Sequence, residues 1–287
     1  MGSTKPLWFS RPMPQGEHLI EVGRVLAQAK VHTVCQSALC PNLGECFADK
    51  TATFMIMGDA CTRDCRFCAV ETGRPRPLDP GEPARVTEAV QSLGLDHAVV
   101  TSVTRDDLPD GGARHFAQTV AAIRERNPGT TVEVLVPDFG GSRSAIETVA
   151  ASRPDVIGHN VETVPRLYGR VRPGADYQRS LQLLRSVAQL DVGIRAKSGL
   201  MLGLGEERRE VVAVMDDLLQ VGCGLLTIGQ YLRPSRDHLD VTRFVLPGEF
   251  VELADQATSR GFRGVAAGPF VRSSYRAGDM LKKGRVE

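Results

Sequence analysis

Short runs of apolar residues alternate along the chain with longer stretches in which apolar residues recur every three or four positions. The short runs are typical of buried strands and lie at 51–57, 97–103, 131–136, 156–160, 193–202 and 225–232. The longer stretches predict helices at 115–126, 144–151, 177–190, 206–221 and 247–260. Residues 17–30 have the same helical spacing, which predicts one further helix ahead of the first strand.

Strands that alternate with helices in this way indicate βαβ units and a parallel sheet. Right-handed crossovers would curl six such units into a partial barrel or a doubly wound sheet. In both arrangements the functional side chains lie at the carboxyl ends of the strands.

The composition is that of an ordinary globular protein. Of the 287 residues, 42% are hydrophobic and 24% are charged, and the formal net charge is +1, so neither intrinsic disorder nor polyanion binding is expected. The low aromatic content of 5% argues against a stacking surface for single-stranded nucleic acid. No apolar run approaches the ~18 residues of a membrane span, and residues 1–11 lack a signal-peptide core. The sequence therefore favours a cytoplasmic protein, or one in an organelle lumen whose targeting segment is already removed, without nucleic-acid or membrane partners.

The seven cysteines of the chain are unevenly distributed. Six of them lie between Cys35 and Cys68, and only Cys223 lies elsewhere. Disulfide frameworks belong to small secreted proteins, whereas clustered cysteines in a reducing compartment more often bind a metal or take part in redox chemistry. We interpret Cys223 as a buried, unreactive thiol.

One cysteine trio follows the first predicted strand. Cys61, Cys65 and Cys68 have C-x3-C-x2-C spacing, and three thiolates on a short loop can bind three irons of a cubane cluster. The fourth iron then stays open to a substrate or cofactor. Structural zinc, the alternative, usually has four ligands in two pairs. The spacing, the aromatic Phe67 before the last cysteine and the position at a strand end favour the cluster.

A second trio lies upstream, where Cys35, Cys40 and Cys46 have C-x4-C-x5-C spacing with no fourth cysteine nearby. The six cysteines could share one zinc or disulfide arrangement. The two trios differ in spacing, however, and the buried strand predicted at 51–57 separates them. We therefore expect two clusters, and a fourth ligand for the upstream one must come from another part of the chain or be absent.

Together these motifs resemble the radical S-adenosylmethionine superfamily, and the upstream trio narrows the resemblance to the lipoyl synthase family. The resemblance spans about residues 17 to 277. Outside the cysteine segments it is carried by 101–112, 159–163, 171–177, 197–206, 229–231 and 272–277. Ala196 is a departure, because the family usually has Thr there.

The resemblance implies the domain organisation. It implies an α/β fold, a partial (β/α)6 barrel over residues 51–245. An N-terminal extension, 1–50, would carry the upstream cysteines, and a C-terminal extension, 246–287, would carry the Arg-Ser-Ser-Tyr segment at 272–275.

The resemblance also implies a reaction. Such sulfurtransferases insert two sulfur atoms, at the sixth and eighth carbons of an octanoyl chain held on a lysine of a carrier protein, and so make the lipoyl cofactor. S-adenosylmethionine would bind the open iron of a 4Fe–4S cluster on the downstream trio, and its reductive cleavage would give a 5′-deoxyadenosyl radical. A second 4Fe–4S cluster, on the upstream trio, would be consumed as the sulfur donor. An unactivated C–H bond has no acidic proton, so a general base could not break it.

Further site residues follow from the resemblance. A serine of the Arg-Ser-Ser-Tyr segment would be a ligand of the second cluster, and we assign Ser274, with Ser273 as the alternative. Ser274 joins Cys61, Cys65 and Cys68 as the residues expected to act in catalysis. Contacts with S-adenosylmethionine are expected from Phe67, Thr104, Asn160, Glu162 and Arg172. Arg172 would pair with the carboxylate of the cofactor.

The implied partners are octanoylated carriers, namely the glycine cleavage H protein or the lipoyl domains of 2-oxoacid dehydrogenases. A reductant such as flavodoxin or ferredoxin and an iron–sulfur carrier for cluster repair are also implied. Two other hypotheses are another sulfur-inserting radical enzyme, similar to biotin synthase or a methylthiotransferase, and a ferredoxin-like carrier or zinc-stabilised module. The upstream trio and the Arg-Ser-Ser-Tyr segment argue against another sulfur-inserting radical enzyme. The predicted barrel argues against a carrier, because a carrier needs no large barrel.

Overall fold

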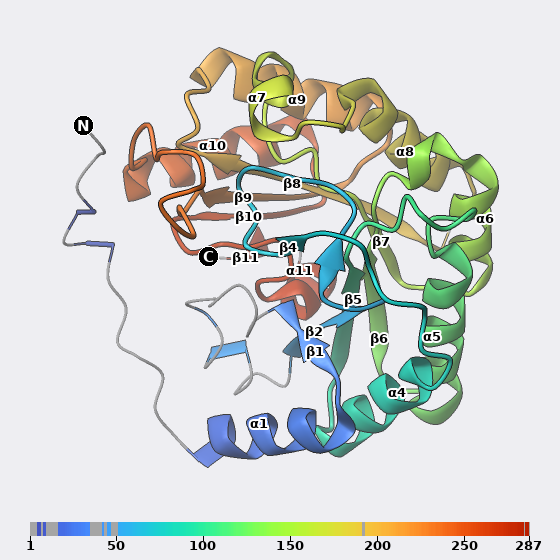
Figure 1. The fold of residues 1–287 in the computed structure, drawn as a ribbon. Helices are drawn as coiled ribbons and strands as arrows, with labels where there is room; N and C mark the ends of the chain where they lie inside the picture. The colour runs from blue at the N-terminus through green and yellow to red at the C-terminus, as the bar shows by residue number, and fades with distance from the viewer. Residues whose placement is uncertain are drawn as a thin grey trace.

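The computed structural model describes residues 5–6, 8–9, 17–34, 42, 45–46, 51–190, 193–283 and 285–286. Within these ranges a nine-stranded sheet has the order β1-β2-β5-β6-β7-β8-β9-β10-β11. It curves into an open barrel, and helices follow one another around its outside (Figure 1). Cys35 and Cys40 lie outside the described residues.

Seven parallel strands form the body of the sheet. They are β2 (Thr51–Ile56), β5 (His97–Ser102), β6 (Thr131–Leu135), β7 (Val156–Gly158), β8 (Arg195–Leu202), β9 (Leu225–Gln230) and β10 (Gly264–Gly268). At the edges, β1 (His32–Thr33) is antiparallel to β2 and β11 (Arg285–Val286) is parallel to β10. The short strands β3 (Ala60–Cys61) and β4 (Glu71–Thr72) pair separately.

The helices between successive parallel strands lie on the outer face, as right-handed crossovers require (Figure 1). They are α4 (Glu82–Ser92), α5 (Ala113–Arg126), α6 (Arg143–Ala151), α7 (Tyr168–Val171), α8 (Tyr177–Leu190), α9 (Arg208–Gln220) and α10 (Pro247–Arg260). Helix α1 (Glu17–Ala29) precedes the sheet, and α11 (Ala277–Lys283) follows β10. Two 3-10 turns, Phe139–Gly141 and Pro165–Leu167, lie in the loops. No helix in the described part of the chain is long and apolar enough to cross a bilayer.

Every strand predicted from an apolar run is present, because these strands are buried on both faces. All six residues of β2 and of β9 are buried, which explains why their sequences are continuous rather than alternating. The sequence did not predict β10, whose sequence Gly-Val-Ala-Ala-Gly has little β propensity. It also did not predict α4, whose apolar face is short.

The C-terminal helix α11 lies against the inner face of the sheet. A Cβ on Gly278 would come within 3.1 Å of the Cβ of His97, which faces inward from β5. On the same helix, the Leu281 carbonyl accepts a hydrogen bond of 2.8 Å from Arg195 of β8. The end of the chain thus fills the space that the open barrel leaves near the amino ends of its strands.

A buried ion pair crosses this interior. The Lys197 ammonium on β8 donates to both carboxylate oxygens of Glu133 on β6, at 2.7 and 2.9 Å, and each residue is only 2% exposed. Burial alone would raise the pKa of Glu133, but Lys197 holds it below its usual range. The pair links two strands that are separated by β7.

Candidate functional site

A cavity of about 310 Å³ lies at the carboxyl ends of the parallel strands. Active sites of parallel barrels lie at this end. The cavity collects predicted site residues that are up to 111 positions apart in sequence: Cys61, Cys65, Phe67, Cys68, Thr104, Asn160, Glu162 and Arg172. Ser273 also lines it, whereas Ser274 and Cys46 do not. One pocket therefore brings together the downstream trio and all the predicted contacts with S-adenosylmethionine.

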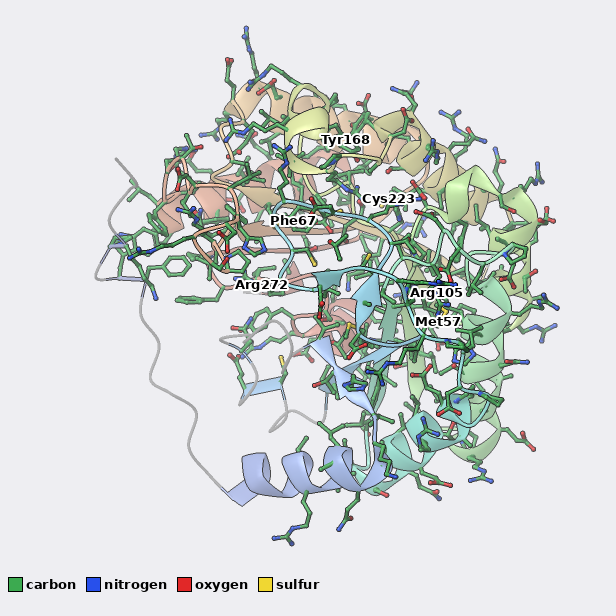
Figure 2. All side chains as sticks on the ribbon, viewed as in Figure 1. Met57, Phe67, Arg105, Tyr168, Cys223 and Arg272 are labelled. Atoms are coloured by element: carbon green, nitrogen blue, oxygen red, sulfur yellow. The ribbon has the colours of Figure 1, made fainter. Side chains whose placement is uncertain are left out.

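The cysteine loop begins with an unusual turn. Met57 has a φ of 68°, in the left-handed region, and Gly58 follows with a φ of 97°. The Met57 N–H donates to the Glu82 carboxylate at 2.8 Å, and Arg105 donates to the Met57 carbonyl at 3.3 Å. Figure 2 shows Met57 and Arg105 side by side. His115 hydrogen-bonds the same carboxylate at 2.7 Å, so buried charged groups fix the point where the loop leaves β2.

Arg63 holds the middle of the loop. Its guanidinium donates two hydrogen bonds to Asp106, at 2.7 and 2.8 Å, and one to Asp138, at 2.7 Å. Although burial opposes ionisation, the hydrogen bonds from Arg63 lower the pKa of Asp138 to about 2. The Thr62 hydroxyl donates to the Thr104 carbonyl at 3.0 Å. The loop is therefore tied to the ends of β5 and β6.

Burial affects the ionisation of two of the three thiols of the loop. Burial raises the pKa of Cys65, and it raises that of Cys68 to about 11, so both thiols need a positive partner to ionise. The Thr104 N–H donates to the Cys61 sulfur at 3.3 Å. In the described ranges, no group of three or more His, Cys, Asp or Glu side chains is placed to hold a single metal ion. A cubane gives each thiolate its own iron, and three thiols on one short loop that line the same cavity fit such a cluster.

The opposite wall contains a buried cation with an unused donor. Arg172 is 8% exposed, and its Nη1 donates to the Asn160 carbonyl at 2.8 Å and to the Tyr168 hydroxyl at 3.2 Å. Its Nε is buried with no hydrogen-bond partner within the described structure. An unpaired buried donor is costly, and a carboxylate is the group that a guanidinium binds best. The site therefore fits the amino-acid end of S-adenosylmethionine.

Glu162 is held close to Arg172. Its φ is 65°, and its backbone bonds to Gly199 and Met201 of β8, at 3.0 and 2.8 Å. Its carboxylate accepts a hydrogen bond of 3.1 Å from the Asn160 amide. Burial raises the pKa of Glu162, and the positive charge of Arg172 opposes that shift. The strained backbone fixes a carboxylate at the cavity wall.

Sequence reasoning missed several residues of this cavity, including Arg63, His159 and Arg272. His159 is 2% exposed, and burial together with Arg172 lowers its pKa to about 4. Its Nδ1 lies 2.8 Å from the Val136 carbonyl, so Nδ1 carries the proton of a neutral ring. Phe67 and Arg272 both lie toward the centre of the open barrel (Figure 2). No local spacing marks such isolated residues, because tertiary structure brings them to the site.

The Arg-Ser-Ser-Tyr segment passes closely over β9. A Cβ on Gly229 would lie 2.2 Å from the Val271 carbonyl oxygen, so only glycine permits this approach. Arg272 donates to the Gln230 carbonyl at 3.3 Å. Cys46, from the N-terminal part of the chain, packs against an apolar cluster that includes Val271. The one described cysteine of the upstream trio thus lies near the serine segment.

Comparisons with known proteins agree with this chemistry. A sequence model of the Radical SAM superfamily matches residues 55–218. Lipoyl synthase from Caldanaerobacter subterraneus subsp. tengcongensis is 58% identical over 95% of this chain and 95% of its own length. Lipoyl synthase from Geobacter metallireducens is 55% identical over 95% of this chain and 96% of its own.

A similar fold is found in the crystal structure of HydG, a maturase of the FeFe hydrogenase. The TM-score is 0.60 and the sequence identity 13%, and the match covers 94% of this chain and 71% of that one. At this identity the likeness concerns the fold alone. The sequence comparisons carry the assignment: the chain belongs to the lipoyl synthase family of the radical S-adenosylmethionine superfamily, and it is a sulfur-inserting enzyme that uses S-adenosylmethionine and iron–sulfur clusters.

Proposed function

We propose that Cys61, Cys65 and Cys68 hold the cluster at which S-adenosylmethionine is cleaved. The observation that carries this proposal is the cavity: the three cysteines and Arg172, whose Nε has no hydrogen-bond partner in the described structure, line the same cavity. Arg172 would bind the carboxylate of the cofactor. The remaining contacts would come from Phe67, Thr104, Asn160 and Glu162.

When bound, the cluster and cofactor supply the hydrogen-atom abstraction that the sixth and eighth octanoyl carbons need. The chain itself provides shape and exclusion of water. Apolar side chains from successive strands line the cavity, among them Met55, Val103, Leu135 and Leu200. They suit an alkyl chain and keep water from a reactive centre.

The upstream cysteines, Cys35, Cys40 and Cys46, would hold the second, sacrificial cluster, with Ser274 as its fourth ligand. A hydroxyl is a weaker iron ligand than a thiolate, which suits a cluster that must come apart. The N-terminal extension, 1–50, and the C-terminal extension, 246–287, would then build this second site beside the barrel of 51–245.

The family acts on lipoyl-carrier proteins. For this chain we propose the glycine cleavage H protein or the lipoyl domains of 2-oxoacid dehydrogenases as carriers. Flavodoxin or ferredoxin would supply electrons, an iron–sulfur carrier would rebuild the second cluster, and the reaction would take place in the cytoplasm.

Mass spectrometry of an octanoyl-lysine peptide tests the reaction. After incubation with reduced, reconstituted enzyme and S-adenosylmethionine, we expect the peptide to gain two sulfur atoms. A methylthio-transferring enzyme would instead add a methylthio group. Cleavage of S-adenosylmethionine with no sulfur on the peptide, in enzyme that holds both clusters, would contradict the proposal.

The serine ligand has its own test. We expect Ser274→Cys to stabilise the second cluster, because thiolate binds iron more strongly than a hydroxyl does, and to reduce turnover by roughly tenfold or more. Ser273→Cys is the matched variant, since Ser273 rather than Ser274 lines the cavity. The measurement is the rate of cluster loss to a chelator, followed by absorbance, together with product formation. Unchanged turnover in Ser274→Cys and impaired turnover in Ser273→Cys would move the assignment to Ser273.

A further inference from the structure

The two ends of the chain meet at one carboxylate. Oε1 of Glu45 accepts hydrogen bonds from the Tyr275 hydroxyl, at 2.8 Å, and from Nη2 and Nε of Arg276, at 2.7 and 3.1 Å. Glu45 directly precedes Cys46, and Tyr275 directly follows Ser274. The contact therefore joins residues that are 230 and 231 positions apart in sequence.

A second contact reinforces the first. The Asn42 amide donates to the Phe270 carbonyl at 2.6 Å, and Asn42 is only 1% exposed. The backbone carbonyl of Asn42 accepts a hydrogen bond of 2.9 Å from the backbone N–H of Cys46. Asn42 and Glu45 are thus both fastened to the C-terminal segment.

The C-terminal side of the contact is rigidly placed. Tyr275 is 5% exposed and belongs to the apolar cluster against which Cys46 packs. Arg276 has a φ of 44°, a conformation that a non-glycine residue adopts only where its surroundings impose it. Close packing of Val271 over Gly229 anchors the same segment to β9. The carboxylate of Glu45 therefore binds donors whose positions the barrel has already set.

We propose that Glu45, Tyr275 and Arg276 form a latch that holds the segment of Cys46 against the serine segment, so that the second cluster site is assembled only when the two extensions are joined. This inference rests on the proposed function of the upstream trio. Glu45 is a positioning residue that acts through Cys46. The latch holds the N-terminal and C-terminal extensions together.

The test compares Glu45→Ala and Glu45→Gln with the wild-type chain after anaerobic reconstitution. We expect Glu45→Ala to fall from about eight to about four irons per chain, to keep forming 5′-deoxyadenosine at the wild-type rate, and to lose sulfur insertion. Glu45→Gln keeps an acceptor oxygen for Tyr275 but loses the charge that pairs with Arg276, so it should retain an intermediate amount of iron. Glu147→Ala is the matched control, because it breaks an exposed ion pair with Arg143 on α6.

A second measurement uses the metal-free chain. The latch predicts that Glu45→Ala increases the alkylation rate of half-buried Cys46 several-fold and leaves that of Cys68 unchanged, with no change in the melting temperature beyond that of the control. Faster alkylation of Cys46 in a variant that still binds about eight irons and inserts sulfur would overturn the proposal. A wild-type chain that binds only about four irons would instead contradict the proposal of a second cluster. The alkylation rates of Cys46 would still decide whether the latch exists.

Discussion

Replacing Cys61 by alanine is expected to abolish cleavage of S-adenosylmethionine, whereas replacing Cys46 by alanine is expected to leave cleavage intact and abolish sulfur insertion. Cys61 lines the cavity, where the Thr104 N–H contacts its sulfur, and Cys46 lies outside the lining. Replacing a residue that hydrogen-bonds a metal ligand commonly lowers metal affinity or activity by ~10–100-fold. Loss of the ligand itself should therefore reduce the affected activity by at least about 100-fold.

The measurement separates the two activities. Formation of 5′-deoxyadenosine reports cleavage, and mass spectrometry of the octanoyl-lysine peptide reports sulfur insertion. Cys223→Ala is the control: its thiol is fully buried, burial raises its pKa to about 12, and it donates to the Leu225 carbonyl at 3.4 Å. Lipoyl product from Cys46→Ala would refute the sulfur-donor assignment, and cleavage by Cys61→Ala would refute the cofactor assignment.

The sequence revealed those parts of the site that short segments encode. The three cysteines of the downstream trio are within eight positions of one another, and the strand before them is a continuous apolar run. Local spacing and local hydrophobicity were therefore sufficient to predict both the trio and its place at a strand end.

The supports of the loop were not predictable in the same way. Met57 is held by Glu82 and Arg105, which are 25 and 48 positions away, and Arg63 is held by Asp106 and Asp138. Each of these residues is an ordinary charged residue in its own segment. Only the curvature of the sheet brings them together, so no local pattern announces them. Strand β10 was not predicted for the same reason: it forms because it pairs with β9, and that pairing overrides the weak β propensity of its own sequence.

Lys197→Met is expected to destabilise the folded chain by about 3–5 kcal/mol, the usual cost of leaving one member of a buried ion pair without its partner. Glu133 would stay in the interior, at 2% exposure, with both oxygens deprived of their Lys197 donor. Nε2 of His97 lies 3.7 Å from the carboxylate, which is too far for a hydrogen bond. Denaturant unfolding of the metal-free chain measures the loss without a contribution from bound clusters.

The double variant Glu133→Met/Lys197→Met decides the cause. It replaces both charged side chains by apolar ones of similar volume, and buried ion pairs replaced in this way often cost little. We therefore expect the double variant to recover most of the stability that the single variant loses, and Glu147→Gln, on the surface, to cost less than about 1 kcal/mol. A double variant as unstable as the single one would show that the lysine acts through packing. Recovery would identify the unpaired carboxylate of Glu133, which precedes the cavity-lining Leu135 by two positions on β6, as the source of the instability.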